Sequence, residues 1–259
     1  LDPPGYISGH GHSARLALVK IRIIEQNLSG TSTFIEPLYG RDTEALYLGA
    51  LLAYQEDNFE LAEQLLLKLF NRSPGNMPSM QLYGMVSYSL ENYEKAAYYL
   101  RKYVSANPDN LTAQKQLSLA YIKLGQFDAA GTTLSASTDE EIEDTELLAL
   151  AIVNAFSSGD NRTGILLLER AAKAAPDNLP LRRELARAYL FSGKTDRAIQ
   201  MYEEIIAQGG PDSETEAMLV LAQARLAQRN GNTEKVLELA KQMQQSQPDY
   251  AMGYELEGI

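Results

Sequence analysis

Apolar residues recur along this chain at the i, i+3, i+4 and i+7 spacing that lines one face of an α-helix. The helical stretches come in pairs, and a proline closes most pairs, because proline cannot continue the helical hydrogen-bond ladder. Pro74 and Pro108 are 34 residues apart, and Pro176 follows Pro108 by 68, which is two periods. Pro248 follows Pro176 by 72, two periods plus four residues. This fixed period predicts an all-α solenoid of stacked helical hairpins, an architecture that usually binds partners.

The 34-residue blocks share small residues at two positions. The blocks begin at Thr43, Met77, Leu111, Thr145, Leu179 and Ala217. Position 8 holds Ala50, Gly84, Ser118, Ile152, Ala186 and Ala224, of which Ile152 is large for the site. Position 20 holds Ala62, Ala96, Ala130, Gly164, Ala198 and Val236. Small residues at one early and one late position let two antiparallel helices pack closely, so each block is predicted to form a helix pair.

A tight turn is predicted between the two helices of every block. Positions 15 and 16 read Asp57-Asn58, Glu91-Asn92, Gly125-Gln126, Gly159-Asp160, Gly193-Lys194 and Gly231-Asn232. Glycine, asparagine and aspartate supply the positive φ or the local hydrogen bonds that such a corner needs. In the first three blocks an aromatic residue (Phe59, Tyr93 or Phe127) follows the turn at position 17. We expect this ring to pack on the preceding helix.

Larger apolar residues fill the other inward positions, as Leu66, Leu100 and Leu134 do at position 24. With these features in each block, the chain resembles the tetratricopeptide repeat family over residues 43–250. The resemblance implies six repeats in a right-handed α-solenoid of stacked antiparallel helix pairs. It also implies that residues 251–259 are the cut first helix of a seventh repeat, so we expect the chain to be a fragment of a longer protein.

Besides Ile152, three residues depart from the family pattern. Ile142 stands where proline is usual, and Gln114 and Arg182 stand where a bulky apolar residue is usual. We therefore expect a distorted junction near residues 137–145. The four-residue insertion predicts a lengthened helix or loop near residues 209–216.

The first 42 residues are predicted to form a tail and a degenerate leading repeat. Residues 1–12 are rich in proline, glycine and histidine and look irregular. The following stretch to Ile24 is rich enough in β-branched residues to permit a strand, but Ser13 as an N-cap favours a helix. Thr31 to Arg41 then forms a shortened second helix, interrupted at Pro37.

Composition narrows the classes of function. A net charge of −11 argues against broad nucleic-acid binding, which needs a basic surface. There is no cysteine, and the two histidines, His10 and His12, lie in the tail, so we expect neither catalysis nor a cofactor. Two histidines without a third ligand are a weak metal motif, and the acidic run at 139–144 lacks the spacing of a calcium loop. No apolar run approaches the ~18–20 residues that span a bilayer.

In the family, the first helices line a concave groove, into which positions 2, 5, 9, 12 and 13 point. The resemblance therefore implies a partner-binding surface made by Tyr47, Leu51, Tyr54, Gln81, Met85, Tyr88, Lys115, Leu119, Phe156, Arg183, Arg187, Arg225 and Arg229. The tyrosine and methionine half suits an apolar segment, and the arginines suit carboxylates or other anions. Alternatively, the arginines pair with Glu184 and other acids along the groove. Position 9 has no asparagine, so the Lys/Asn clamp by which some members hold a peptide C-terminus is missing.

Some short segments of the sequence resemble a narrower group of proteins. They lie at residues 99–103, 147–151 and 247–258, and they are similar to the long repeat lipoproteins of bacterial exopolysaccharide and PEP-CTERM (exosortase) systems. This resemblance implies an envelope-associated scaffold on the periplasmic side of a Gram-negative cell, with a lipid anchor upstream of the repeats.

The leading hypothesis is a non-catalytic scaffold that holds a protein or peptide segment in its groove, within an envelope assembly for polysaccharide export or surface-protein sorting. A cytoplasmic adaptor or chaperone-like module is one alternative. Direct binding of a polysaccharide by the tyrosines and arginines is another.

Overall fold

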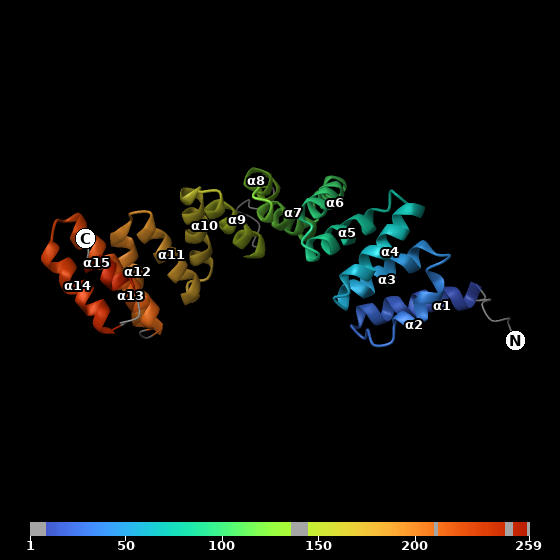
Figure 1. Ribbon diagram of the computed structural model, residues 1–259, viewed down its shortest axis with the longest axis horizontal. Coiled ribbons are helices and arrows are strands. Elements are labelled where there is room, and N and C mark those ends of the chain that lie inside the picture. Colours follow the sequence, from blue (N-terminus) through green and yellow to red (C-terminus); the bar gives the residue numbers. More distant parts are fainter. Residues whose placement is uncertain (1–8, 136–144, 210–211, 247–250, 258–259) are drawn as a thin grey trace. The chain divides into compact units, whose positions relative to one another are not determined.

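A computed structural model describes residues 9–135, 145–209, 212–246 and 251–257. Within these residues the chain is helical and forms no strand, which confirms the all-α prediction (Figure 1). The chain divides into two compact units, Leu1–Asp139 and Glu140–Ile259, here called the first and second unit. Each unit is described by itself.

The helices follow one another with short connections. The first unit contains α1 (Gly9–Ile24), α2 (Ser32–Ile35), the 3-10 helix η1 (Glu36–Leu38), α3 (Thr43–Gln55), α4 (Phe59–Arg72), α5 (Met77–Ser89), α6 (Tyr93–Ala106), α7 (Leu111–Lys123) and α8 (Phe127–Ser135). The second contains α9 (Thr145–Ser157), α10 (Asn161–Ala174), α11 (Leu179–Phe191), α12 (Thr195–Gly209), α13 (Ser213–Arg229), α14 (Thr233–Ser246) and α15 (Met252–Glu257).

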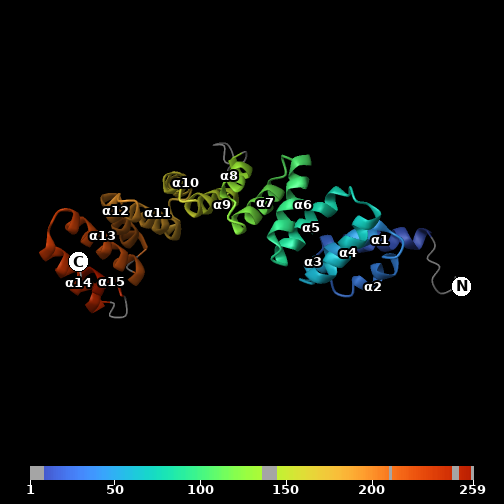
Figure 2. The ribbon, with the colours of Figure 1, turned by 45° about the horizontal axis from the view of Figure 1, so that its top comes forward.

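Within each unit, consecutive helices pack side by side (Figures 1 and 2). The first helices of neighbouring pairs also touch, as α3 does with α5, α5 with α7, and α11 with α13. The pairs therefore stack as a solenoid, and the first helices of a unit form one shared surface, called here the first-helix face. The seams between helices are close: a Cβ added at Gly84 would lie 2.5 Å from Cγ of the wholly buried Leu100.

The helix corners repeat one backbone conformation. Position 15 has a positive φ in every block: Asp57 (56°), Glu91 (58°), Gly125 (68°), Gly159 (81°), Gly193 (80°) and Gly231 (71°). Four of the six are glycine, which adopts this conformation without strain. The predicted turns are thus confirmed, and they require positive φ even where the residue is Asp57 or Glu91.

Side-chain caps set the helix starts. Asn76, Asn110 and Asn178 each accept a hydrogen bond from the backbone N–H three residues on, and their helices begin at the next residue. Asp42 and Asp212 do the same before α3 and α13. Such caps satisfy backbone donors that have no partner inside the helix.

The N-terminal region corrects one prediction. Helix α1 already begins at Gly9, so Ser13 lies inside the helix and does not cap it, and residues 9–12 are helical, not irregular. The strand alternative for this stretch is wrong. The shortened second helix is α2, and Pro37 is the second residue of the 3-10 helix η1 that follows it. Burial of the hydroxyl of Tyr39, next to that turn, raises its pKa to about 12.

The four-residue insertion lengthens a helix. Helix α13 has 17 residues, whereas the first helices α3, α5, α7, α9 and α11 have 13 each. The predicted distorted junction lies almost wholly outside the described residues, as do Ile142, Gly210-Pro211 and the acidic run at 139–144.

The two polar residues at apolar positions are buried with partners. Arg182 is only 9% exposed and donates hydrogen bonds of 2.6 Å to both Gln208 and Glu204. Gln114 is buried and donates to the carbonyl of Pro108. These hydrogen bonds offset part of the free energy that a polar side chain loses when it leaves water.

Candidate functional site

Two predicted groove tyrosines of the first unit pack against aromatic rings of their own repeats. Tyr54 packs against Phe59 with the ring centroids 5.7 Å apart, and Tyr88 packs against Tyr93 at 5.3 Å. Each pair joins position 12 to position 17 of its block. The other predicted residues of this unit lie partly exposed on the first helices: Tyr47, Leu51, Gln81, Met85, Lys115 and Leu119. Burial raises the pKa of Tyr47, so its hydroxyl stays neutral at physiological pH.

Most of the predicted arginines of the second unit are neutralised within it. Arg187 donates to Glu184 at 2.5 Å, and Arg229 donates to Asp196 at 2.9 Å. The interpretation that they pair with acids therefore describes these two residues better than open anion sites do.

Arg183 is paired in the same way. Its Nη1 lies 3.4 Å from carboxylate oxygens of both Asp212 and Glu214. Asp212 caps α13, and Glu214 lies in the extra first turn of that helix. The insertion thus supplies one of the two acids that neutralise Arg183, namely Glu214.

Arg225 behaves differently from the other three. Its Cζ lies 4.9 Å from the centroid of the Phe191 ring, a cation–π geometry. Within the part of the chain that the structure describes, no carboxylate forms an ion pair with it. Arg225 is therefore a local positive centre on an acidic chain.

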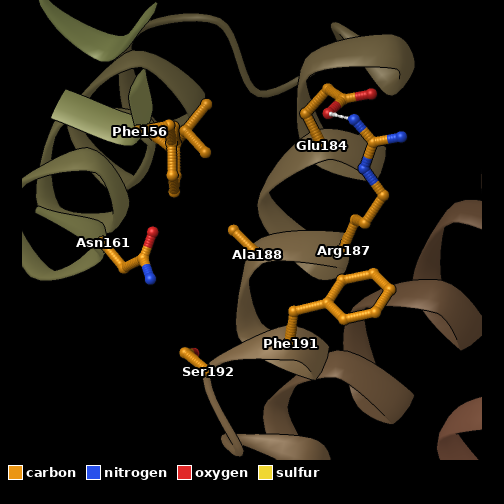
Figure 3. A pocket seen from close by; sticks show the side chains of 8 residues that line it. Phe156, Asn161, Glu184, Arg187, Ala188, Phe191 and Ser192 are labelled. Atoms are coloured by element: carbon orange, nitrogen blue, oxygen red, sulfur yellow. Dashed lines mark hydrogen bonds and ion pairs between the residues drawn. The ribbon is translucent and has the colours of Figure 1, made fainter. Parts of the chain in front are cut away.

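A cavity of about 210 Å³ opens beside the first helices of the second unit. Figure 3 shows Phe156 and Asn161 on one side of it, with Ala188 of α11 and Ser192, the residue that follows α11, pointing toward them. The paired Glu184 and Arg187 extend from α11 away from Phe156 (Figure 3). Phe156, Asn161, Leu168, Glu184, Arg187, Ala188, Phe191 and Ser192 line it.

The cavity exists because of two small residues. Position 17 of this block is Asn161, where the first unit has the rings of Phe59, Tyr93 and Phe127. The Phe156 ring instead lies over Gly164, where an added Cβ would meet its edge at 2.8 Å. The space that an aromatic residue at position 17 would fill thus stays open.

Two apolar side chains of this face were not among the predicted site residues. Phe191 is 59% exposed and Val153 is 48% exposed. Both occupy block positions that the family resemblance assigns to the groove, 13 and 9, so the sequence held a signal for them. Ala188, Asn161 and Ser192 carried no such signal, because the cavity they line depends on packing.

One buried polar group of the second unit has no partner among the described residues. The side chain of Tyr202 is wholly buried at position 24, and its hydroxyl makes no hydrogen bond to the described residues. Burial raises the pKa of Tyr202 above its ordinary value, with smaller effects from Arg187, Glu184, Glu214 and Arg183. The hydroxyl is therefore neutral.

No metal-binding cluster of three or more His, Cys, Asp or Glu side chains occurs among the described residues. The side chain of His12 contacts the carboxylate of Asp42, the cap of α3. The described helices also include none with the length and apolar content to cross a membrane.

Comparison with known families supports the periodicity. The model of the tetratricopeptide repeat family matches residues 88–151 and 155–219. This chain contains tetratricopeptide repeats. None of the curated proteins matches the sequence.

Solved structures of other repeat proteins share the fold at low sequence identity. The C-terminal part of a TPR repeat-containing protein from Cytophaga hutchinsonii is 14% identical, with a TM-score of 0.70, over 93% of this chain and 98% of that one. A tetratricopeptide repeat protein from Parabacteroides merdae is 13% identical, with a TM-score of 0.61, over 96% and 98%. YrrB, described as a TPR protein with an unusual peptide-binding site, is 14% identical, with a TM-score of 0.57, over 75% and 98%.

Proposed function

We propose that this chain is a non-catalytic scaffold whose tetratricopeptide repeats hold a segment of a partner protein on the first-helix face. The observation that carries the proposal is the open part of that face in the second unit, where Val153 is exposed and Phe191, also exposed, lines a cavity. Exposed apolar side chains next to a concave site are typical of protein-binding surfaces. The peptide-binding site of YrrB, which shares the fold, adds support for this mode of binding.

Site-specific photo-crosslinking in extracts of the source organism tests the proposal. A benzophenone amino acid is placed at Val153 or Met85 on first helices, and at the exposed Lys68 or Glu203 on second helices as controls. We expect a discrete crosslinked protein from one or both first-helix positions and from neither control. Equal labelling at all four positions, or none at any, would contradict the scaffold proposal.

We further propose that the scaffold works in the bacterial envelope, in polysaccharide export or surface-protein sorting. The support is the resemblance at residues 99–103, 147–151 and 247–258 to lipoproteins of such systems. Fractionation of cells that express the natural gene product with a C-terminal tag tests this, and the protein is expected in the envelope fraction. Recovery in the cytosol would favour the cytoplasmic adaptor instead.

A further inference from the structure

We propose that the cavity beside Phe156 is a socket for one large apolar side chain of the partner, and that a carboxylate close to that side chain binds Arg225. The occupant is thus an acidic peptide segment with an apolar anchor. This inference rests on the proposed function and assigns the chemistry of its ligand.

The size of the cavity favours a single side chain. Its volume of about 210 Å³ lies below the roughly 300–1,000 Å³ of sites that enclose a small molecule. Its walls include the apolar side chains of Phe156, Leu168 and Ala188, while Asn161 and Ser192 add polar atoms. A pocket that accepts one anchor residue of a longer segment is a common mode of peptide recognition.

The charges around the cavity favour an acidic ligand. Glu184 and Arg187, which line it, neutralise each other. Asp212 and Glu214 neutralise the charge of Arg183, and Asp196 neutralises that of Arg229. Arg225 is left with the Phe191 ring as its contact and with no carboxylate among the described residues.

The position of Arg225 suits a carboxylate that arrives with the anchor. Phe191 lines the cavity, and the guanidinium of Arg225 lies against the Phe191 ring. The positive charge of Arg225 is therefore separated from the socket by the side chain of Phe191. A guanidinium that rests on a ring with its face can still donate hydrogen bonds from its edge to a carboxylate. The chain would therefore bind the apolar anchor and the carboxylate of the partner at the same time.

In the first two blocks, the positions that match Phe156 and Asn161 hold rings that pack against each other. There, Phe59 and Tyr93 at position 17 already pack against Tyr54 and Tyr88 at position 12, in tilted or edge-on contacts. This difference supplies the variant that tests the proposal. Replacing Asn161→Tyr restores an aromatic residue at position 17 and is expected to fill the socket.

The matched control is Thr233→Tyr. Thr233 occupies position 17 of the last block, is exposed like Asn161, and does not line the cavity. Asn161 is the first residue of α10, and the cap of that helix is Asp160, so the substitution leaves the cap intact. Both variants are expected to unfold at or above the wild-type temperature, which shows that any lost binding is not caused by unfolding.

The probe is a phage-displayed library of short linear peptides, selected on the purified chain. We expect enriched sequences to pair a large apolar residue with Asp or Glu a few positions away. For a synthetic peptide of that kind, fluorescence anisotropy should show Kd raised about tenfold or more by Asn161→Tyr and unchanged by Thr233→Tyr. Arg225→Glu should weaken the same peptide and improve a version whose acid is replaced by lysine.

The other outcomes overturn the inference in distinguishable ways. Peptides that ignore Asn161→Tyr but lose binding on Met85→Ala would place the ligand in the first unit and leave the scaffold function standing. Binding that requires no acid, or no enriched peptide at all, would also contradict the inference. Retention of the chain on alginate or dextran beads that Asn161→Tyr abolishes would assign the socket to a polysaccharide.

Discussion

The two units differ in what lies beside position 12 of their first helices. In the first unit, Tyr54 and Tyr88 are covered by the ring that follows the turn. In the second, Phe156 has Asn161 at that place and a cavity next to it. Position 17 of the fourth block thus leaves room beside Phe156 that the aromatic residues of the first two blocks fill.

The predicted groove residues of the two units also differ in charge. The first unit offers tyrosines and one lysine among the predicted site residues, and the second offers arginines. Three of the four arginines are held by acids of the same unit, so the number of cations overstates the charge available to a ligand. Only Arg225 differs, because an aromatic ring occupies its neighbourhood in place of an acid.

The largest expected effect tests the closed packing of the first unit. Gly84→Leu should lower the free energy of unfolding by about 3 kcal/mol, because the new side chain meets Leu100, which is wholly buried and cannot move aside. Chemical denaturation measures it. Gly75→Leu is the control, since a Cβ there has no atom within 4 Å. An unfolding midpoint of Gly84→Leu equal to wild type would show that the seam is not close-packed.

A milder replacement compares the two units directly. Gly84→Ala should cost more stability than Gly164→Ala, because the atom in the way at Gly164 is the ring edge of Phe156. That ring can turn into the neighbouring cavity, whereas the side chain of Leu100 is wholly buried. Equal losses in the two variants would mean that Phe156 is held as firmly as Leu100.

The next effect concerns the helix corners. Glu91 has φ of 58°, a conformation that costs an ordinary residue about 1 kcal/mol, whereas Gly193 adopts the same corner freely. Glu91→Gly should therefore stabilise the chain by about that amount, and Gly193→Glu should destabilise it similarly. Thermal unfolding measures both. Loss of stability in Glu91→Gly would point to a role for the glutamate side chain.

Two buried tyrosines of the second unit should respond in opposite directions. The Tyr189 hydroxyl donates a 2.6 Å hydrogen bond to Glu169, so Tyr189→Phe should cost about 1 kcal/mol. The Tyr202 hydroxyl has no partner among the described residues, so Tyr202→Phe should be neutral or stabilising by up to about 1 kcal/mol. A clear loss of stability in Tyr202→Phe would reveal a partner for that hydroxyl.

The smallest effect is a pH dependence. Hydrogen bonds from Thr215 hold the pKa of Asp212 below its ordinary value of 3.8, although burial alone would raise it. The ionised cap therefore adds stability above that value, and this contribution is lost as pH falls through the lower folded pKa. Urea unfolding between about pH 5 and pH 3 should show a shallower decline for Asp212→Asn than for wild type. Identical slopes would contradict the assigned shift.

Much of the fold could be predicted because its signals are local and repeat. The turn sequences between helices, the small residues and the prolines that end the helix pairs each determine the structure of residues close to them in the sequence. The start of α1 was missed because Ser13 resembles a cap, and a helix that begins at Gly9 has no comparable signal. Asn76 and Asn110 were a readable signal, since each precedes its helix by one residue.

The candidate site was less predictable, because its properties depend on residues about one repeat apart. Arg229 is neutralised by Asp196, and the cavity beside Ala188 is left open by Asn161. Neither relation can be read from one helix. The block position of Phe191 suggested exposure to the groove, but only packing shows how much of the ring stays uncovered.

The 17-residue helix α13 has a consequence for how this chain can change in length. Four added residues rotate a helix by little more than one full turn, so the apolar stripe beyond the addition still meets its neighbours. The corner at Gly231 keeps the same backbone geometry as the others. Insertions and deletions of whole turns ahead of a repeat are thus expected to be tolerated, whereas a change of two residues would bring the polar side of the helix into the core.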